Sequence, residues 1–125
     1  MEKVTGIGGI FFKARDPQRM STWYKDHLGL PVENNVAELI APNPNEPKHT
    51  KRTVWSLFPQ DTDYFGMGPQ SFMINYRVVN LESFVEQLRS QGVEVQKVEV
   101  CEYGKFSWIT DPEGNRVELW EPIEK

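Results

Sequence analysis

The feature that most constrains this chain is a strand followed by a capped helix, because this pattern occurs twice. In the first copy, the apolar segment 7–14 precedes Asp16 and Pro17, which are typical of the N-cap and of the first position of a helix. In the second copy, the apolar segment 72–79 precedes Asn80, another good N-cap residue, 64 positions after Asp16. A single repeat of this length predicts two modules of one domain rather than a solenoid.

Each predicted helix has one apolar face and a glycine just beyond its end. The helices are predicted over residues 17–27 and 81–91, where apolar side chains recur every three or four positions. Gly29 and Gly92 follow the last turns, and a glycine at this position commonly ends a helix.

Short strands follow each helix. Candidate strands are 31–36, 37–41 and 53–58 in the first module, and 93–95, 98–103, 106–110 and 116–120 in the second. Composition predicts a loop at 42–51, a linker at 59–70 and a tight turn at 111–115. We therefore predict an α+β fold of two modules, about residues 1–60 and 70–125, with a ligand-binding cleft between their sheets.

Length and charge exclude several classes of protein. A chain of 125 residues fits one domain. Its net charge of −4 argues against nucleic-acid or anionic-membrane binding, because phosphate binding needs a basic patch. No apolar run approaches the roughly 20 residues of a membrane span, and residues 1–9 resemble no signal peptide, so a cytoplasmic location is expected. Cys101 is the single cysteine, which excludes an intrachain disulfide.

Two motifs carry a resemblance to a known family. The letters WY…HLGL at 23–30 follow the first strand, and DPEGNRVEL at 111–119 precedes the C-terminus. Together with the repeat, they resemble the vicinal oxygen chelate superfamily of glyoxalases, bleomycin-resistance proteins and extradiol dioxygenases. The likeness spans essentially the whole chain and is greatest to small bacterial glyoxalase-like members. It implies two βαβββ modules whose curved mixed sheets enclose a cleft.

The resemblance also implies a metal site, and this sequence departs from it. Active members hold one divalent ion with side chains from the first and last strands of the modules. The corresponding positions here are Gly9, Ser56, Met73 and Glu118, of which only Glu118 is a competent ligand. A thioether suits neither Mg²⁺ nor Zn²⁺, and a catalytic ion usually needs about three protein ligands. We therefore expect no metal and no other cofactor.

Alternation along the strands assigns side chains to the expected cleft. The residues placed in this way are Phe11, Phe58, Met73, Asn75, Arg77, Glu118 and Trp120, and they are the predicted ligand-binding residues together with Trp108. Trp108, Tyr103 and Phe106 are candidates for the rim of the cleft, and alternation does not fix which way they face. Aromatic walls with a few polar groups suit a planar or aromatic small molecule. The alternative is that these aromatic side chains simply fill the space between the sheets.

Other chemistry-bearing residues receive structural interpretations. Glu118 could act as a general base, but pairing with Arg77 or Lys13 is the favoured interpretation. His27, near a helix end, and His49, in the proline-rich loop, are not expected to be catalytic, and Cys101 is expected to be a small buried residue. Trp23 and Tyr24, on the apolar helical face, are expected in the core.

Three functions remain open from the sequence. The leading hypothesis is a metal-free protein that binds a small molecule, as the antibiotic-sequestering relatives do. The second is a lyase, isomerase or dioxygenase-like enzyme with an atypical site. The third is a protein-interaction domain with a filled cleft. By its resemblance to family members that pair through a two-fold axis, the chain is also expected to form a homodimer.

Overall fold

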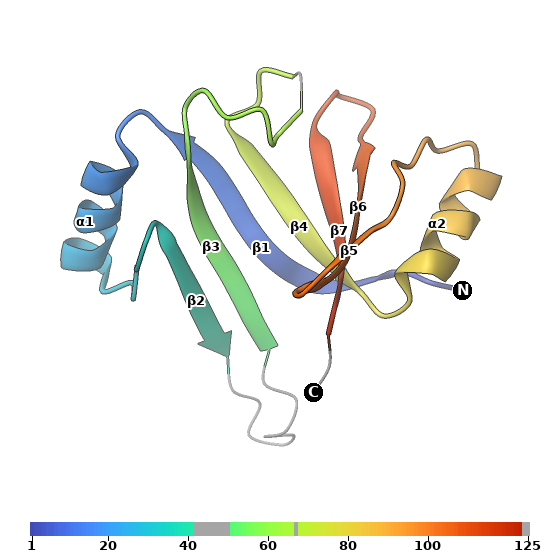
Figure 1. The fold of residues 1–125 in the computed structure, drawn as a ribbon, viewed down its shortest axis with the longest axis horizontal. Helices are drawn as coiled ribbons and strands as arrows, with labels where there is room; N and C mark the ends of the chain where they lie inside the picture. Colours follow the sequence, from blue (N-terminus) through green and yellow to red (C-terminus); the bar gives the residue numbers. More distant parts are fainter. Residues whose placement is uncertain (42–50, 67, 124–125) are drawn as a thin grey trace.

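The computed structural model describes residues 1–41, 51–66 and 68–123. These residues form seven strands and two helices. In chain order the elements are β1 (Val4–Ala14), α1 (Pro17–Leu28), β2 (Val36–Ala41), β3 (Lys51–Pro59), β4 (Phe72–Val78), α2 (Leu81–Ser90), β5 (Glu99–Cys101), β6 (Gly104–Thr110) and β7 (Arg116–Pro122). All seven strands join one curved sheet in the order β2-β3-β1-β4-β7-β6-β5 (Figure 1). The predicted α+β fold class is confirmed.

The sheet has two similar halves that meet at β1 and β4. These strands are antiparallel neighbours, and each pairs in parallel with a later strand of its own module, β3 or β7. Ile10 pairs with Ile74 in the middle of the central pair. This pair has the same offset of 64 residues as the capping residues Asp16 and Asn80, so the sequence repeat corresponds to an approximate two-fold relation between the halves.

The two helices form where the capping residues predict them. The Asp16 carboxylate accepts a hydrogen bond from the Arg19 amide at 3.1 Å, and the Asn80 side chain accepts one from the Ser83 amide at 3.2 Å. After α1, Gly29 has a φ of 68°, a left-handed conformation that glycine adopts without steric cost. Each helix therefore begins and ends close to the predicted residues.

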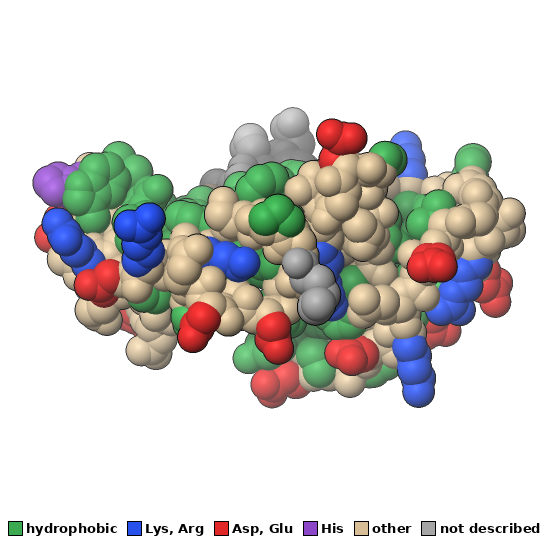
Figure 2. All heavy atoms as spheres, turned by 90° about the horizontal axis from the view of Figure 1, so that it is seen from above, with side chains coloured by type: hydrophobic (Ala, Val, Ile, Leu, Met, Phe, Trp, Pro, Cys, Tyr) green, Lys and Arg blue, Asp and Glu red, His purple; other side chains and the backbone are tan. Residues whose placement is uncertain are grey.

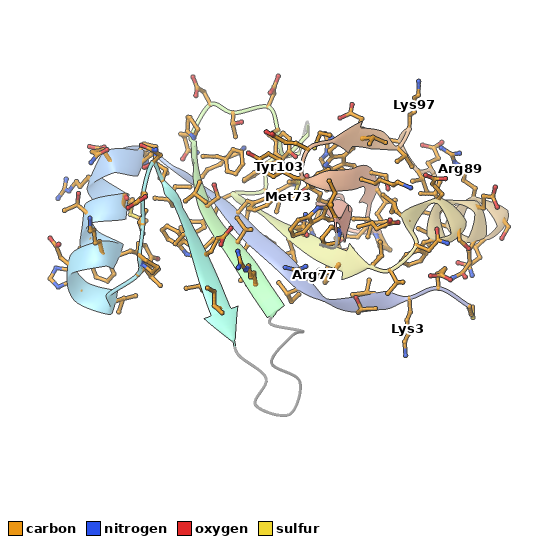
Figure 3. All side chains as sticks on the ribbon, turned by 60° about the horizontal axis from the view of Figure 1, so that its bottom comes forward. Lys3, Met73, Arg77, Arg89, Lys97 and Tyr103 are labelled. Carbon is orange, nitrogen blue, oxygen red and sulfur yellow. The ribbon has the colours of Figure 1, made fainter. Side chains whose placement is uncertain are left out.

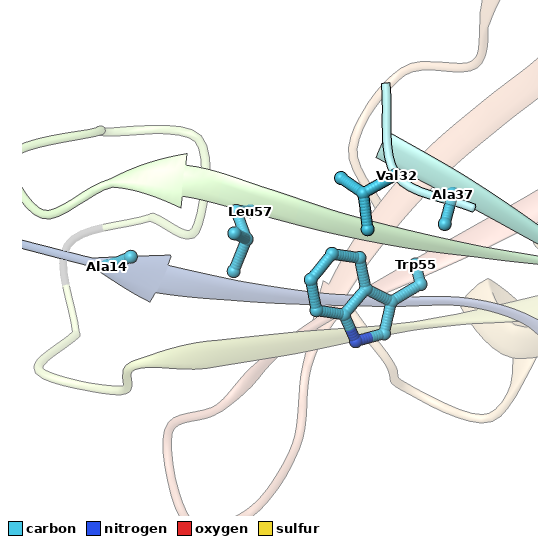
Figure 4. Packing of buried hydrophobic residues seen from close by; sticks show 5 residues of the cluster. All are labelled: Ala14, Val32, Ala37, Trp55 and Leu57. Atoms are coloured by element: carbon cyan, nitrogen blue, oxygen red, sulfur yellow. The ribbon is translucent and has the colours of Figure 1, made fainter. Parts of the chain in front are cut away.

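Each helix covers its own half of one sheet face, which we call the helix-bearing face. Under α1 the buried residues are Ala14, Val32, Ala37, Trp55 and Leu57 (Figure 4). Under α2 they are Val78, Leu81, Phe84, Val85 and Leu119. Helices lie at the two ends of the sheet in Figure 1. Burying apolar surface stabilises the folded state by about 25 cal/mol per Å². The two clusters therefore stabilise the packing of the helices on the sheet.

Two predicted strands do not form. Residues 31–35 form no strand, and Glu33 makes only an isolated bridge to Val36, the first residue of β2. Asn34 and Asn35 have φ values of 52° and 68° and turn the chain sharply. Residues 93–95 leave the sheet as well, and Val95 packs against the α2 cluster instead. Each module, as far as the structure describes it, thus has one strand fewer than predicted.

The described surface carries charges of both signs. Figure 2 shows acidic and basic side chains interspersed over the face it presents. None of the described helices is long and apolar enough to cross a membrane.

Candidate functional site

Strand register brings the four expected metal-ligand positions together on the face that carries no helix, here called the helix-free face. Gly9 on β1 pairs with Asn75 on β4, which in turn pairs with Glu118 on β7. In the next row, Ser56 on β3 pairs with Phe11, and Phe11 pairs with Met73. These six positions therefore lie side by side on the helix-free face, near the middle of the sheet.

Glu118 is the centre of a hydrogen-bond network. Its side chain is only 1% exposed. Oε1 accepts a hydrogen bond from Asn75 Nδ2 at 2.6 Å, and Oε2 accepts from Trp108 Nε1 at 2.8 Å and from the Tyr64 hydroxyl at 2.5 Å. All three donors are neutral groups, so both carboxylate oxygens are satisfied without a cation.

The predicted pairing of Glu118 with Arg77 or Lys13 is wrong. Arg77 lies over the ring of Trp120 at 4.8 Å and donates to the backbone carbonyl of Arg52. Lys13 instead places its Nζ 5.6 Å from the ring centre of Phe65. Each of these two cations lies over an aromatic ring, whose face attracts positive charge through the ring quadrupole.

The expected open cleft is filled by a segment that composition assigned to a linker. Phe65 has no exposed surface, and its ring contacts Phe58 edge-on at 5.1 Å. Tyr64 stacks on Phe58 at 5.4 Å with nearly parallel rings and reaches Glu118 with its hydroxyl. Gln70 fixes the segment by donating from Nε2 to the Phe65 carbonyl at 2.9 Å. We call Tyr64 and Phe65 the aromatic plug.

Sequence reasoning missed both residues of the plug. Their segment is rich in Gly, Pro and Asp, and such composition is typical of a solvated connection. The available signal was the pair of adjacent large aromatic residues, Tyr64 and Phe65, inside that polar segment. Buried aromatic rings remove much apolar area from water, and the uncovered sheet face provides the place for them.

The predicted ligand-binding residues fall into two groups. Phe11, Met73 and Trp108 are buried in one cluster with Phe65, and Phe58 packs against that cluster. Glu118 and Asn75 are buried as well, and Glu118 is hydrogen-bonded to both Tyr64 and Asn75. Arg77 and Trp120 are half-buried. Figure 3 shows Met73 and Arg77 over the central strands.

Aromatic rings continue across β6 and β7 as a stacked row. Phe106 lies between Trp108, at 6.5 Å, and Trp120, at 5.8 Å, with both ring pairs nearly parallel. The guanidinium of Arg116 lies over Trp108 at 5.1 Å, as that of Arg77 lies over Trp120 at the other end. The row therefore presents aromatic surface between two cations.

A hollow of about 590 Å³ opens beside the plug. It is lined by Tyr64, Lys97, Val98, Glu99, Val100, Cys101, Tyr103, Phe106 and Trp108. Tyr64 and Trp108 both line this hollow and donate to Glu118. The hollow and the hydrogen-bond network are thus separated by these two side chains.

The Tyr64 hydroxyl is held in its neutral form. Burial raises the pKa of Tyr64, and the neighbouring Glu118 charge and hydrogen bond raise it further. A phenol with a raised pKa stays protonated at ordinary pH. Tyr64 therefore serves as a hydrogen-bond donor here and is unsuited to act as a base.

The donor set at the centre of the helix-free face does not fit a divalent metal. A side chain at Gly9 would meet the Phe11 ring at 2.8 Å and the Val54 carbonyl at 3.2 Å, so the position is already covered. Met73 lies in the aromatic cluster, and Glu118 is engaged by three donors. Within residues 1–41, 51–66 and 68–123, no three His, Cys, Asp or Glu side chains are grouped to hold an ion.

The predictions that Trp23 and Cys101 are buried are wrong. Trp23 is 51% exposed and packs against His27, whereas Tyr24 joins the core under α1 as predicted. Cys101 is exposed rather than buried, because β5 is the edge strand of the sheet. His49 lies outside the described residues.

Comparisons with known proteins agree with this architecture. Residues 6–119 match the model of the Glyoxalase/Bleomycin resistance protein/Dioxygenase superfamily. No curated protein sequence matches the chain.

Solved structures share the fold at low sequence identity. Methylmalonyl-CoA epimerase from Mycobacterium tuberculosis is 24% identical over 97% of this chain and 90% of that one, with a TM-score of 0.59. A Streptomyces coelicolor methylmalonyl-CoA epimerase variant in complex with 2-nitronate-propionyl-CoA is 16% identical over 98% and 100% of the two chains, with a TM-score of 0.70. A superfamily member from Vibrio splendidus 12B01 is 11% identical over 97% and 99%, with a TM-score of 0.58. With the family model covering nearly the whole chain, the protein belongs to the glyoxalase/bleomycin resistance protein/dioxygenase superfamily.

Proposed function

We propose that this protein binds a planar or aromatic small molecule at its helix-free face without a metal ion. The observation that carries this proposal is the environment of Glu118, whose carboxylate is held by Asn75, Trp108 and Tyr64 among aromatic rings. A buried acceptor with neutral donors and aromatic walls can orient a ligand. It lacks the several anionic or imidazole ligands that a catalytic ion needs.

The hollow beside Tyr64 supports the same proposal. Its volume of about 590 Å³ lies within the roughly 300–1,000 Å³ typical of small-molecule sites. Phe106 and Trp108 line the hollow with aromatic side chains, and aromatic side chains favour offset or edge-on contact with another planar ring. Among the structural relatives, the Streptomyces coelicolor epimerase holds a small organic ligand, 2-nitronate-propionyl-CoA.

A filled interaction domain is the second candidate. It is favoured by Phe65, which is fully buried on the face where the sequence predicted a ligand-binding cleft. In that case the plug is a permanent part of the core. No small aromatic molecule would then stabilise the folded chain.

Thermal unfolding of the purified protein distinguishes the candidates. A ligand that binds only the folded state raises the midpoint in proportion to the logarithm of its concentration above Kd. We expect planar aromatic probes to raise the midpoint saturably, and Zn²⁺, Ni²⁺ or Mn²⁺ to leave it unchanged. Elemental analysis of protein never exposed to chelator should find far less than one metal equivalent. A stoichiometric ion, or no response to any aromatic probe, would contradict the proposal.

A further inference from the structure

Tyr64 occupies a position that a diffusible molecule could also occupy. Its ring is stacked on Phe58 at 5.4 Å and meets Trp108 edge-on at 6.4 Å, while its hydroxyl donates to Glu118. These are the contacts that a bound phenol would make: a parallel ring, a perpendicular ring and a carboxylate acceptor. The Tyr64 side chain therefore outlines a binding place for an aromatic ring that bears a hydrogen-bond donor.

The other members of this arrangement are fixed more firmly than Tyr64. Trp108 and Glu118 are paired neighbours on β6 and β7 and are almost fully buried. Asn75 lies on the central strand β4 and is equally buried. Tyr64 is 36% exposed, belongs to no strand or helix, and borders the hollow. If its side chain turned outward, the hollow would become continuous with Glu118.

We propose that the ligand is a planar aromatic molecule with a hydroxyl or N–H donor, and that it binds by replacing Tyr64 at Glu118. This inference rests on the proposed function and specifies its ligand class. Glu118 and Trp108 then recognise the incoming donor and ring, and Tyr64 acts as an internal competitor. The apparent association constant equals the intrinsic association constant multiplied by the fraction of molecules in which the Tyr64 side chain has turned away from Glu118.

Weakening an internal competitor should change the ligand affinity in the opposite direction from weakening a residue that contacts the ligand. Removing the Tyr64 hydroxyl weakens the competitor, so the affinity for a hydroxylated ligand should increase. If the hydroxyl instead contacted the ligand, the same change would decrease the affinity. Tyr64→Phe keeps the ring and removes only the donor, which makes it the deciding variant.

The experiment is a calorimetric titration of the wild type, Tyr64→Phe and Tyr64→Ala with 2-naphthol and with 2-methoxynaphthalene. The two probes share one ring system, but only 2-naphthol donates a hydrogen bond. Tyr76→Phe is the matched control, because Tyr76 packs on the helix-bearing face against the α2 cluster. Far-ultraviolet circular dichroism establishes that each variant is folded.

We expect Tyr64→Phe to bind 2-naphthol about tenfold more tightly than the wild type, since a hydrogen bond to a charged group is worth at least that factor. Tyr64→Ala should strengthen binding of both probes and still prefer 2-naphthol by about tenfold. Tyr76→Phe should leave both affinities as in the wild type.

The titrations distinguish failure of the Tyr64 replacement from failure of the proposed function. If 2-naphthol and 2-methoxynaphthalene bind equally well to all folded variants, or if Tyr64→Phe weakens 2-naphthol binding, replacement of Tyr64 is overturned while the proposed function stands. If neither probe binds to the wild type, Tyr64→Phe or folded Tyr64→Ala, the proposed function fails together with the inference.

Discussion

The Glu118 carboxylate lies in apolar surroundings, where an isolated charge would cost several kcal/mol. Three neutral donors offset that cost, and two of them, Asn75 and Trp108, are its neighbours on adjacent strands. Alternation along the strands placed Asn75 and Glu118 on one sheet face, whereas it left the facing of Trp108 open. The third donor, Tyr64, comes from 54 positions away in the chain, and nothing in its local sequence specifies that partner. Single-sequence reasoning therefore predicted the strand residues of the site and missed the residue from the connection.

Tyr64→Phe should destabilise the free protein, because it removes one of two hydrogen bonds to Glu118 Oε2. We expect a loss of about 1–2 kcal/mol in the free energy of unfolding, since part of the site is accessible to water. Urea denaturation of the variant and the wild type measures this loss. Tyr103→Phe, at an exposed tyrosine, is the control and should change stability by less than about 0.5 kcal/mol. Equal effects of both substitutions would contradict the assigned role of the Tyr64 hydroxyl.

Gly8→Ala should be destabilising, because the side chains above Gly8 leave no room for a methyl group. A Cβ there would collide with Asn75 Oδ1 and would approach Trp120 Cε3 to 2.8 Å. Overpacking of this kind typically costs about 1–3 kcal/mol. Gly6→Ala, on the same strand, is the matched control, because nothing lies within 4 Å of its Cβ. Chemical denaturation should separate the two variants, and a Gly8→Ala protein as stable as Gly6→Ala would refute the close packing of Asn75 against β1.

At the scale of elements, the segments with strong local signals formed as predicted. Asp16 and Asn80 cap the helices, and Gly29 ends α1. The strand predicted at 31–36 failed because the Asn34–Asn35 pair favours a tight turn over extended backbone. An Asn-Asn pair next to a valine carries both signals, and the local sequence alone does not say which one prevails.

The contribution of Asp111, in the turn between β6 and β7, to the stability of the fold should decrease in acid. Hydrogen bonds from the Asn115 backbone and side chain, and then from the Glu113 and Gly114 amides, lower the pKa of Asp111 below its ordinary value of 3.8. A lowered folded-state pKa means that the charged form stabilises the fold above that ordinary value, and that this contribution is lost as the pH falls through the lower folded value. Asp111→Asn should therefore be less stable than the wild type at about pH 7, with the difference shrinking at about pH 2. Urea midpoints at both pH values measure it, and a difference independent of pH would be the contrary result.

At the scale of the whole molecule, the repeat predicted two related halves, and the described sheet has them. What the repeat could not specify is how the helix-free face is covered. Phe65 and Phe58 meet there through a contact between β3 and the connection that follows it, and such a contact has no periodic signature. Whether a cleft is open or filled depends on contacts of this kind.

The helix-bearing face leaves apolar residues uncovered between the two helices. Ile7, Ile10 and Phe72 are each more than 40% exposed on the central strands. Contiguous exposed apolar surface commonly marks an interface, and a patch on an approximate two-fold axis suits pairing of two identical chains. Light scattering should therefore give twice the chain mass of 14.5 kDa. Ile10→Asp should shift the protein to the monomer, whereas Val79→Asp, at an exposed position beside α2, should not. A monomeric wild type at micromolar concentration would disprove this arrangement.

The central claim is that the helix-free face binds a planar aromatic molecule and needs no metal to do so. The most direct measurement is a calorimetric titration of the wild-type protein with 2-naphthol, carried out once in EDTA and once in buffer containing Mn²⁺ and Zn²⁺. We predict saturable binding of one molecule per chain with the same affinity in both buffers, because Glu118 is held by the neutral donors Asn75 and Trp108 and needs no ion. Binding that disappears in EDTA, or no saturable binding in either buffer, would contradict the claim.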